Sequence, residues 1–430
     1  MDEPTSVPAL AAPPRKADNP LTRSVAGVLG LGFLGLMVLA CLLSLPYTLA
    51  PVVDPAARAA AEASGDELPR GTPRYAAGNP NAGRLPPVWA PADERDLRRL
   101  NAAVPATVVE QLANELAVTP DELLAAESGP LAEALRAHHH RTLLGTDALG
   151  RSLWARVLLG GSISLGIGIA AAALSVCIGT LYGAIAGYAG GLIDSVMMRI
   201  VDVLYGLPYI LLVVLLAVAV DAVVDNMIAE NVPRIAAQRE VYVQSALSAL
   251  PEAERTPAAT ERLQIQALDR FGTGEPTAAT RTTINVVTLL VAIGGVSWLT
   301  MARVVRGQVL SLKNQPFVEA ARAVGAPTRR IFLRHLLPNL LGPVIVYATL
   351  TVPQAILQES FLSFLGIGVQ PPLPSWGNLA ADGLNEINTT RSNWWLLLFP
   401  CLLLGSTLLA LNFVGEGLRE AFDPKRARVA

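Results

Sequence analysis

The stretch ISLGIGIAAAALSVCIGTLYGAIAGY, residues 163–188, decides the fold because it carries no charged side chain from end to end. About twenty apolar residues in an α-helix cross the roughly 30 Å of hydrocarbon in a bilayer, and the helix satisfies every backbone polar group internally. A soluble protein rarely contains so long an uncharged run. This stretch therefore predicts a membrane-spanning helix.

Five further stretches meet the same test, and the whole chain is 52% hydrophobic and only 16% charged. They are Val25 to Pro51, Val203 to Val220, Thr283 to Ala302, Leu340 to Phe364 and Trp394 to Gly415. The first is too long for the core of a signal peptide and follows a polar leader, which indicates a retained anchor. The Val203 stretch is short and contains Pro208, so its ends are the least defined. These runs predict an all-α membrane protein with six transmembrane helices.

Basic residues near the span ends predict the orientation, because short cytoplasmic loops are enriched in Arg and Lys. Such residues precede the first span, fill the connection between the fourth and fifth, and close the chain, so both termini are expected in the cytoplasm. The predicted parts are a cytoplasmic tail (1–24), the first span (25–51), an extracytoplasmic loop (52–156), spans two and three (157–220), an extracytoplasmic insertion (221–281), spans four to six with a cytoplasmic loop at 303–338 (282–415), and a cytoplasmic tail (416–430).

Both outer segments carry helix signals. Thr119-Pro120-Asp121-Glu122 has the pattern of a capping box, which predicts short helices near 110–116 and 123–135, and Thr256-Pro257 marks another helix start. The consecutive histidines His138, His139 and His140 suggest a metal site. Consecutive side chains on a helix point in different directions, however, so a solvated loop is the preferred interpretation and no metal site is predicted.

The connection between spans four and five contains a short helix with defined ends, from Gln315 to Pro327. Pro316 suits the first turn, Gly325 suits a left-handed C-terminal position, and Pro327 prevents continuation. Phe317, Ala320, Ala321 and Val324 follow helical spacing and predict a narrow apolar stripe. A second helix is expected from Thr328 to Pro338. The segment is either a plain connector or a docking element, and its small-residue stripe favours docking into a groove of another protein.

The motif Glu319-Ala320-Ala321, followed by Gly325 and Leu337-Pro338, resembles the EAA loop of binding-protein-dependent ABC importer permeases. Many of these permeases have isoleucine at the position of His335. A histidine there resembles the dipeptide, oligopeptide and nickel branch. Segments 144–152 (LGTDALGRS) and 371–377 (PPLPSWG) resemble the same branch, and the single anchor followed by the Gly-Thr-Asp-x-Leu-Gly-Arg segment is similar to its second permease subunit. Both outer segments are longer than this family leads us to expect.

The resemblance implies a type I ABC importer permease fold with extracytoplasmic helical insertions, in a bacterial inner membrane. It implies as partners a second permease, two ABC ATPases, an extracytoplasmic substrate-binding protein and the bilayer. Di- or oligopeptides are the expected substrates, and nickel chelates or other solutes stay open. The residues that it assigns to ATPase coupling are Phe317, Glu319, Ala320, Ala321, Gly325, His335 and Pro338.

No enzyme is expected in this chain. A phosphate-binding loop needs a lysine after a glycine, and none of Lys16, Lys313 and Lys425 follows one, so ATP and Mg are expected on partner subunits and no cofactor here. The net charge of −2 gives no sign of a nucleic-acid partner. Two alternatives remain, a stand-alone secondary transporter or channel and a membrane scaffold. Glu359, a carboxylate inside the fifth span, has either a pathway or inter-subunit role, or a structural hydrogen bond or interfacial position.

Overall fold

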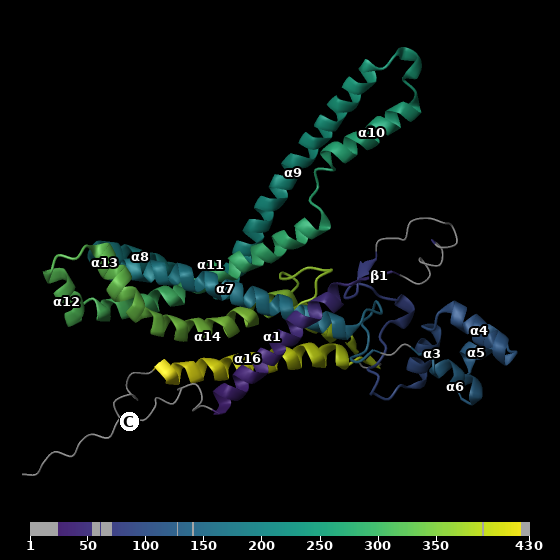
Figure 1. Ribbon diagram of the computed structural model, residues 1–430, viewed down its shortest axis with the longest axis horizontal. Helices are drawn as coiled ribbons and strands as arrows, with labels where there is room; N and C mark the ends of the chain where they lie inside the picture. The colour runs from purple at the N-terminus through teal and green to yellow at the C-terminus, as the bar shows by residue number, and fades with distance from the viewer. Residues whose placement is uncertain are drawn as a thin grey trace, which may run out of the picture.

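The computed structural model describes residues 25–53, 61, 71–126, 128–139, 142–388 and 391–422. Within these residues, six helical segments are long and apolar enough to cross a membrane, which confirms the prediction of six spans in an all-α protein. Figure 1 shows them as an elongated bundle. They are α1 (Val25–Leu49), α7 (Leu153–Ala189), α9 (Tyr209–Ala249), α11 (Ala278–Leu312), α14 (Leu337–Phe364) with the short segments before it, and α16 (Trp395–Phe422).

Helix α7 lies at the centre of the bundle and packs against α1, α11 and α14, while α1 also packs along α16. Its contact with α11 is built on glycines spaced four residues apart. A Cβ atom on Gly179, Gly183 or Gly187 would lie within 2.9 Å of an atom of α11, and at Gly183 it would meet the Ala302 carbonyl oxygen at 2.2 Å. Small residues at this spacing let two helix backbones approach closely inside a membrane. The glycines therefore make α7 and α11 a tightly packed pair.

The third span begins later than the sequence predicted. Residues from Val203 to Tyr205 belong to a separate helix, α8 (Gly191–Tyr205), and α9 starts only at Tyr209. Pro208 lies at the N-cap of α9, where it needs no helical hydrogen bond of its own. The proline thus divides the predicted Val203–Val220 span into the end of one helix and the start of the next.

Helix α9 also runs past the predicted end of the span. It continues through Pro233 to Ala249 without interruption, and the turn η3 (Glu252–Glu254) then leads into α10 (Pro257–Phe271), which packs back along it. Figure 1 shows this hairpin projecting from the bundle. Residues 221–249 of the expected insertion at 221–281 are therefore an extension of the third helix itself. Thr256 caps α10 as the sequence predicted, because its side chain accepts a hydrogen bond from the Ala259 N–H.

The first outer segment forms a small helical subdomain at the opposite end of the bundle from α12 (Figure 1). The predicted capping box at Thr119 is present, but the expected 123–135 helix is two helices, because Gly129 and Pro130 interrupt it. Residues 51–52 pair with residues 72–73 to form a minimal antiparallel sheet. The elements are β1 (Pro51–Val52), β2 (Thr72–Pro73), η2 (Pro80–Ala82), α3 (Glu94–Ala102), α4 (Ala106–Leu116), α5 (Pro120–Ala125) and α6 (Pro130–Arg136).

A short helix, α15 (Trp376–Asn385), lies between α14 and α16 and packs against both. Trp376 is fully buried, and its indole N–H donates to the Val157 carbonyl of α7 at 3.1 Å. A second small antiparallel pair, β3 (Ile387–Asn388) and β4 (Arg391–Ser392), connects α15 to α16. The segment from 365 to 392 thus covers one end of the bundle.

Candidate functional site

The segment expected to dock on another protein forms helix α12 (Pro316–Ala323) at one tip of the bundle (Figure 1). Gly325 has φ +77°, the left-handed conformation that the sequence predicted. The Ala326 N–H donates to the Ala321 carbonyl at 3.0 Å, and the Gly325 N–H to the Arg322 carbonyl at 2.9 Å. These two bonds make a Schellman motif, which satisfies carbonyl groups that would otherwise be left open at the helix end. The helix therefore ends at a defined residue.

Val318 anchors α12 to the rest of the protein, and the sequence reasoning missed it. Its side chain is fully buried in a cluster with Ile331 and Leu336, and the half-buried Tyr188 and Leu312 pack against this cluster. Tyr188 lies in the last turn of α7 and Leu312 is the last residue of α11, so the anchor joins α12 to the glycine-packed pair. Lys313, next to Leu312, donates a hydrogen bond to the Gly187 carbonyl at 2.9 Å.

The expected apolar stripe is only partly free. Phe317 is 39% exposed and Val324 89% exposed, and Glu319 and Ala320 are exposed as well, but Ala321 packs against the Val318 cluster. The prediction that the whole stripe is available for docking was therefore wrong for Ala321. Helix spacing alone cannot say which of two adjacent apolar edges packs against the rest of the protein. The exposed residues of α12 and its C-cap include Phe317, Glu319, Ala320, Arg322 and Val324.

The predicted second helix, from Thr328 to Pro338, is also different in detail. It consists of α13 (Thr328–Ile331) and a π-helical turn, η4 (Phe332–Leu336), which continues into α14 without a break. Pro338 has no N–H and crowds the carbonyl four residues earlier, and the wider turn just before it accommodates this. His335 lies in the turn, with its ring 6.4 Å from the Phe317 ring. The structure thus brings Phe317 and His335 together and places Pro338 at the start of α14.

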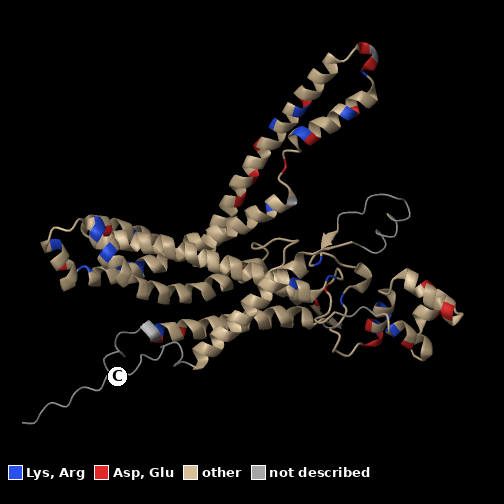
Figure 2. Cartoon of the chain, in the orientation of Figure 1, with Lys and Arg blue, Asp and Glu red and all other residues tan. Residues whose placement is uncertain are grey.

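Two ion pairs connect α8 to α11 near this tip. Arg306 donates two hydrogen bonds to Asp194, and Arg303 donates one to Asp202 at 2.8 Å. The hydrogen bonds from Arg306 hold the pKa of Asp194 below its ordinary value. Basic side chains gather at this end of the bundle (Figure 2). These ion pairs join α8 to α11, and the Val318 cluster joins α12 to α7 and α11.

Glu359 is fully buried, in a cluster of serine hydroxyls. Ser363 donates to its carboxyl at 2.8 Å and Ser360 at 3.2 Å, and Ser164 and Ser375 lie around the same group. Ser363 in turn accepts the Val369 N–H at 2.9 Å. The carboxyl therefore orients hydroxyls that satisfy the backbone of the 365–378 segment. This environment favours the structural interpretation of Glu359 over the pathway interpretation.

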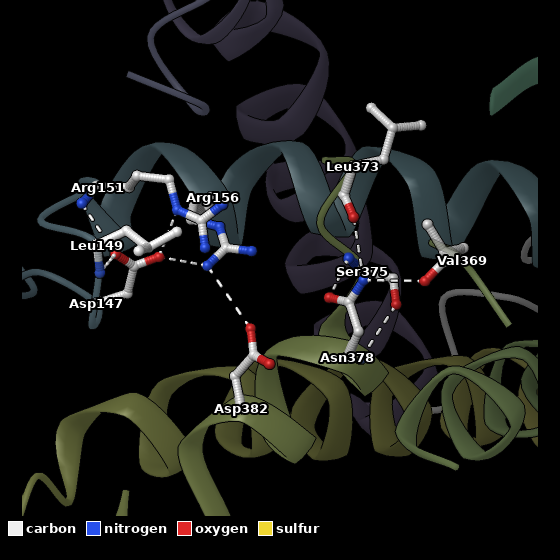
Figure 3. Close-up of polar contacts among 9 residues, drawn as sticks. All are labelled: Asp147, Leu149, Arg151, Arg156, Val369, Leu373, Ser375, Asn378 and Asp382. Atoms are coloured by element: carbon white, nitrogen blue, oxygen red, sulfur yellow. Dashed lines mark hydrogen bonds and ion pairs between the residues drawn. The ribbon is translucent and has the colours of Figure 1, made fainter. Parts of the chain in front are cut away.

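A second polar cluster holds α15 at its other end (Figure 3). The Asp147 carboxylate accepts hydrogen bonds from the Arg151 and Arg156 side chains, and Arg156 lies 3.7 Å from Asp382 of α15.

The start of α15 is capped by Ser375 and Asn378. The Asn378 side chain also donates hydrogen bonds to the Val369 and Leu373 carbonyls (Figure 3).

Among the described residues, no three or more His, Cys, Asp and Glu side chains are grouped so that they could hold a metal ion. His139 lies 2.8 Å from the Asn101 side-chain oxygen and is thereby part of the outer subdomain. His140 lies outside the described residues.

The spans, the capped α12 segment and the motifs around it agree with a comparison against known families. Residues 179–428 match the family described as binding-protein-dependent transport system inner membrane component. The chain belongs to this family. It is therefore a multi-pass membrane permease subunit and not itself an enzyme, in agreement with the sequence-based resemblance.

Curated relatives of this permease lie in the branch that the motifs indicated. The chain is 42% identical to the oligopeptide transport system permease protein OppC of Haemophilus influenzae. The 281 aligned residues make up 65% of this chain and 70% of the relative. The chain is 40% identical over 284 residues to the dipeptide transport system permease protein DppC of Bacillus subtilis, covering 66% and 69%. OppC of Escherichia coli K12 is 43% identical over 281 residues, covering 65% and 72%.

Proposed function

We propose that this chain is one of two permease subunits of an ATP-driven importer that moves di- or oligopeptides into the cytoplasm. The observation that carries the proposal is α12, a capped helix that presents Phe317, Glu319, Ala320 and Val324 to solvent while Val318 anchors it to α7 and α11. The names of the relatives, which are oligopeptide and dipeptide permeases, support the substrate class.

The exposed face of α12 docks into a groove on a separate ABC ATPase, which binds ATP and Mg. Because the helix end is closed by Gly325 and its base is packed, a movement of the ATPase is passed to α11 and α14 as a rigid shift. Alternating closure and opening of the paired permeases then exposes the pathway to one side of the membrane at a time. Phe317, Glu319, Ala320, Gly325 and His335 belong to this coupling segment, and Ala321 and Pro338 support its shape.

The orientation is proposed from the distribution of charge. The tip that bears α12 gathers basic side chains (Figure 2), which favours the cytoplasmic side for this tip and for both termini. The subdomain α3–α6 and the hairpin of α9 and α10 are then extracytoplasmic, where an extracytoplasmic substrate-binding protein delivers the peptide.

The test is uptake of radiolabelled alanine peptides of two to five residues into proteoliposomes that contain the complete complex, with its second permease, ATPases and binding protein. Uptake that requires ATP and stops when an ATPase is inactivated supports an importer. Uptake driven by an ion gradient without ATP would indicate a secondary transporter. Absence of uptake, with an intact complex, would favour a scaffold.

A further inference from the structure

Helix α14 carries a stripe of uncharged polar side chains within its apolar sequence. Tyr347, Thr351, Gln354 and Gln358 are spaced by four, three and four residues, so they lie on one face of the helix. Gln354 is exposed, Tyr347 is 37% exposed, and Thr351 and Gln358 are half-buried. Glu359 and its serines lie on the opposite, buried side. The helix therefore has one polar face that the protein itself does not cover.

Two other spans hold Gln358 in place. The Tyr209 hydroxyl, at the start of α9, donates to the Gln358 side-chain oxygen at 2.5 Å. The same hydroxyl lies 2.8 Å from the Ser297 hydroxyl of α11. Three helices thus converge on one amide group and fix its orientation.

The remaining hydrogen-bonding capacity of this face is open. Within the part of the chain that the structure describes, no residue accepts a hydrogen bond from the Gln358 side-chain nitrogen, and the Gln354 side chain has no hydrogen-bond partner. Each nitrogen carries two N–H donors. A face with open donors is poorly suited to hydrocarbon, which offers no acceptor, so it must meet water, a solute or another protein.

We propose that this face lines the substrate pathway and that Gln354 and Gln358 hydrogen-bond the main chain of a passing peptide. The inference rests on the proposed function. Side-chain amides match peptide groups, because each has one carbonyl acceptor and N–H donors. The stripe contains no charged residue, so it contacts the main chain without discriminating between charged peptide side chains. Tyr209 and Ser297 act as positioning residues by holding the Gln358 oxygen.

Thiol labelling of the assembled complex tests whether the face is aqueous. Thr351→Cys, Gln354→Cys and Gln358→Cys are made in a chain in which the exposed Cys177 and Cys401 are serine and the buried Cys41 is kept. Leu181→Cys, at a 61% exposed apolar position on α7, is the reference. A charged methanethiosulfonate reagent is expected to label the stripe at least tenfold faster than Leu181→Cys, and saturating trialanine is expected to slow this labelling.

Three results of this experiment would overturn the inference. Labelling as slow as that of Leu181→Cys would place the stripe against lipid. Labelling in the isolated chain but not in the complex would place it against the second permease. Labelling that trialanine does not slow would show an aqueous face that does not bind peptide.

Transport kinetics provide a second test. Gln358→Leu is expected to raise the KM for trialanine about fivefold and the Gln354→Leu, Gln358→Leu pair more than tenfold, because each loses one or two hydrogen bonds to the substrate. Thr349→Val removes a hydroxyl from the side of α14 that faces Gly415 of α16, and it is expected to leave the KM unchanged. An unchanged KM in the double variant would overturn the inference.

The two proposals fail in different ways. A wild-type complex that takes up no alanine peptide would contradict the proposed peptide importer, while the labelling rates would still show whether the stripe is aqueous. A wild-type complex that imports these peptides, with a stripe that is neither labelled nor needed, would contradict only the pathway assignment.

Discussion

Arg306 reaches Asp194 with two parallel hydrogen bonds, from Nε at 2.5 Å and from the second guanidinium nitrogen at 2.7 Å, and so joins α11 to α8. Asp194→Asn is expected to lower the free energy of unfolding in detergent by about 1–2 kcal/mol at pH 7, because the charged pair is partly buried. The matched variant Asp202→Asn breaks a more exposed pair and is expected to cost about 0.5 kcal/mol or less.

The same pair predicts a pH dependence. Arg306 lowers the pKa of Asp194 in the folded state, so the folded protein favours the ionised carboxylate. The stabilisation is fully present above the ordinary carboxyl pKa of about 4 and is lost as the pH falls through the lower, folded-state pKa. The difference in unfolding temperature between the wild type and Asp194→Asn should therefore be largest at pH 7 and shrink progressively as the pH falls below about 4. A constant difference across this range would contradict the assignment.

Gly183 permits the close contact of α7 with α11. Gly183→Ala is expected to destabilise the protein by about 1–3 kcal/mol, because the new Cβ would meet the Ala302 carbonyl oxygen at 2.2 Å. Gly166→Ala, on the same helix with open space around it, is expected to be neutral or slightly stabilising. Thermal unfolding in one detergent compares the two, and equal unfolding temperatures would exclude a steric role for Gly183.

Gly325 closes the coupling helix with a left-handed backbone. A Cβ there meets no neighbouring atom, so any effect of a substitution comes from the backbone conformation. Gly325→Val is expected to reduce peptide uptake per ATP hydrolysed at least fivefold, whereas Gly325→Asn should retain most of it, because asparagine tolerates this conformation. Measuring uptake and ATP hydrolysis on the same proteoliposomes gives the ratio. A Gly325→Val complex with the normal ratio would argue against coupling through α12.

Glu359 accepts hydrogen bonds from buried serines, and an amide cannot replace all of them. Glu359→Gln is expected to cost about 1–3 kcal/mol of stability, because its nitrogen faces hydroxyls that need an acceptor. The exposed Glu416→Gln is the control and should change stability by less than about 0.5 kcal/mol. Unchanged stability of Glu359→Gln together with loss of peptide uptake would instead support the pathway interpretation.

The orientation can be tested at Arg322, an exposed residue of α12. Arg322→Cys is expected to react with a membrane-impermeant maleimide only in inside-out vesicles. Glu115→Cys, exposed at the end of α4, should react only in right-side-out vesicles. The opposite pattern would place α12 outside the cell and contradict both the orientation and the coupling role.

Part of this structure follows directly from the sequence. Uncharged runs predict the six spans, and Pro316 with Gly325 predicts the ends of α12, because these signals act locally. The length of α9 could not be predicted, since Asp221, Asp225 and Glu230 make its outer half look like a loop and Pro233 lies inside it. The hydrogen bonds that link Tyr209, Ser297 and Gln358 could not be predicted either. They depend on how three helices pack, and no local sequence pattern contains that information.

At Gly179, Gly183 and Gly187 the backbone of α7 approaches α11 so closely that no side chain fits between them, and the Tyr182 and Trp298 rings lie 4.7 Å apart across the same seam. The two helices are therefore expected to move together. If an ATPase pushes on α12, the pair is expected to tilt as a unit, so that a small rotation near α12 gives a larger displacement at the other end of α11.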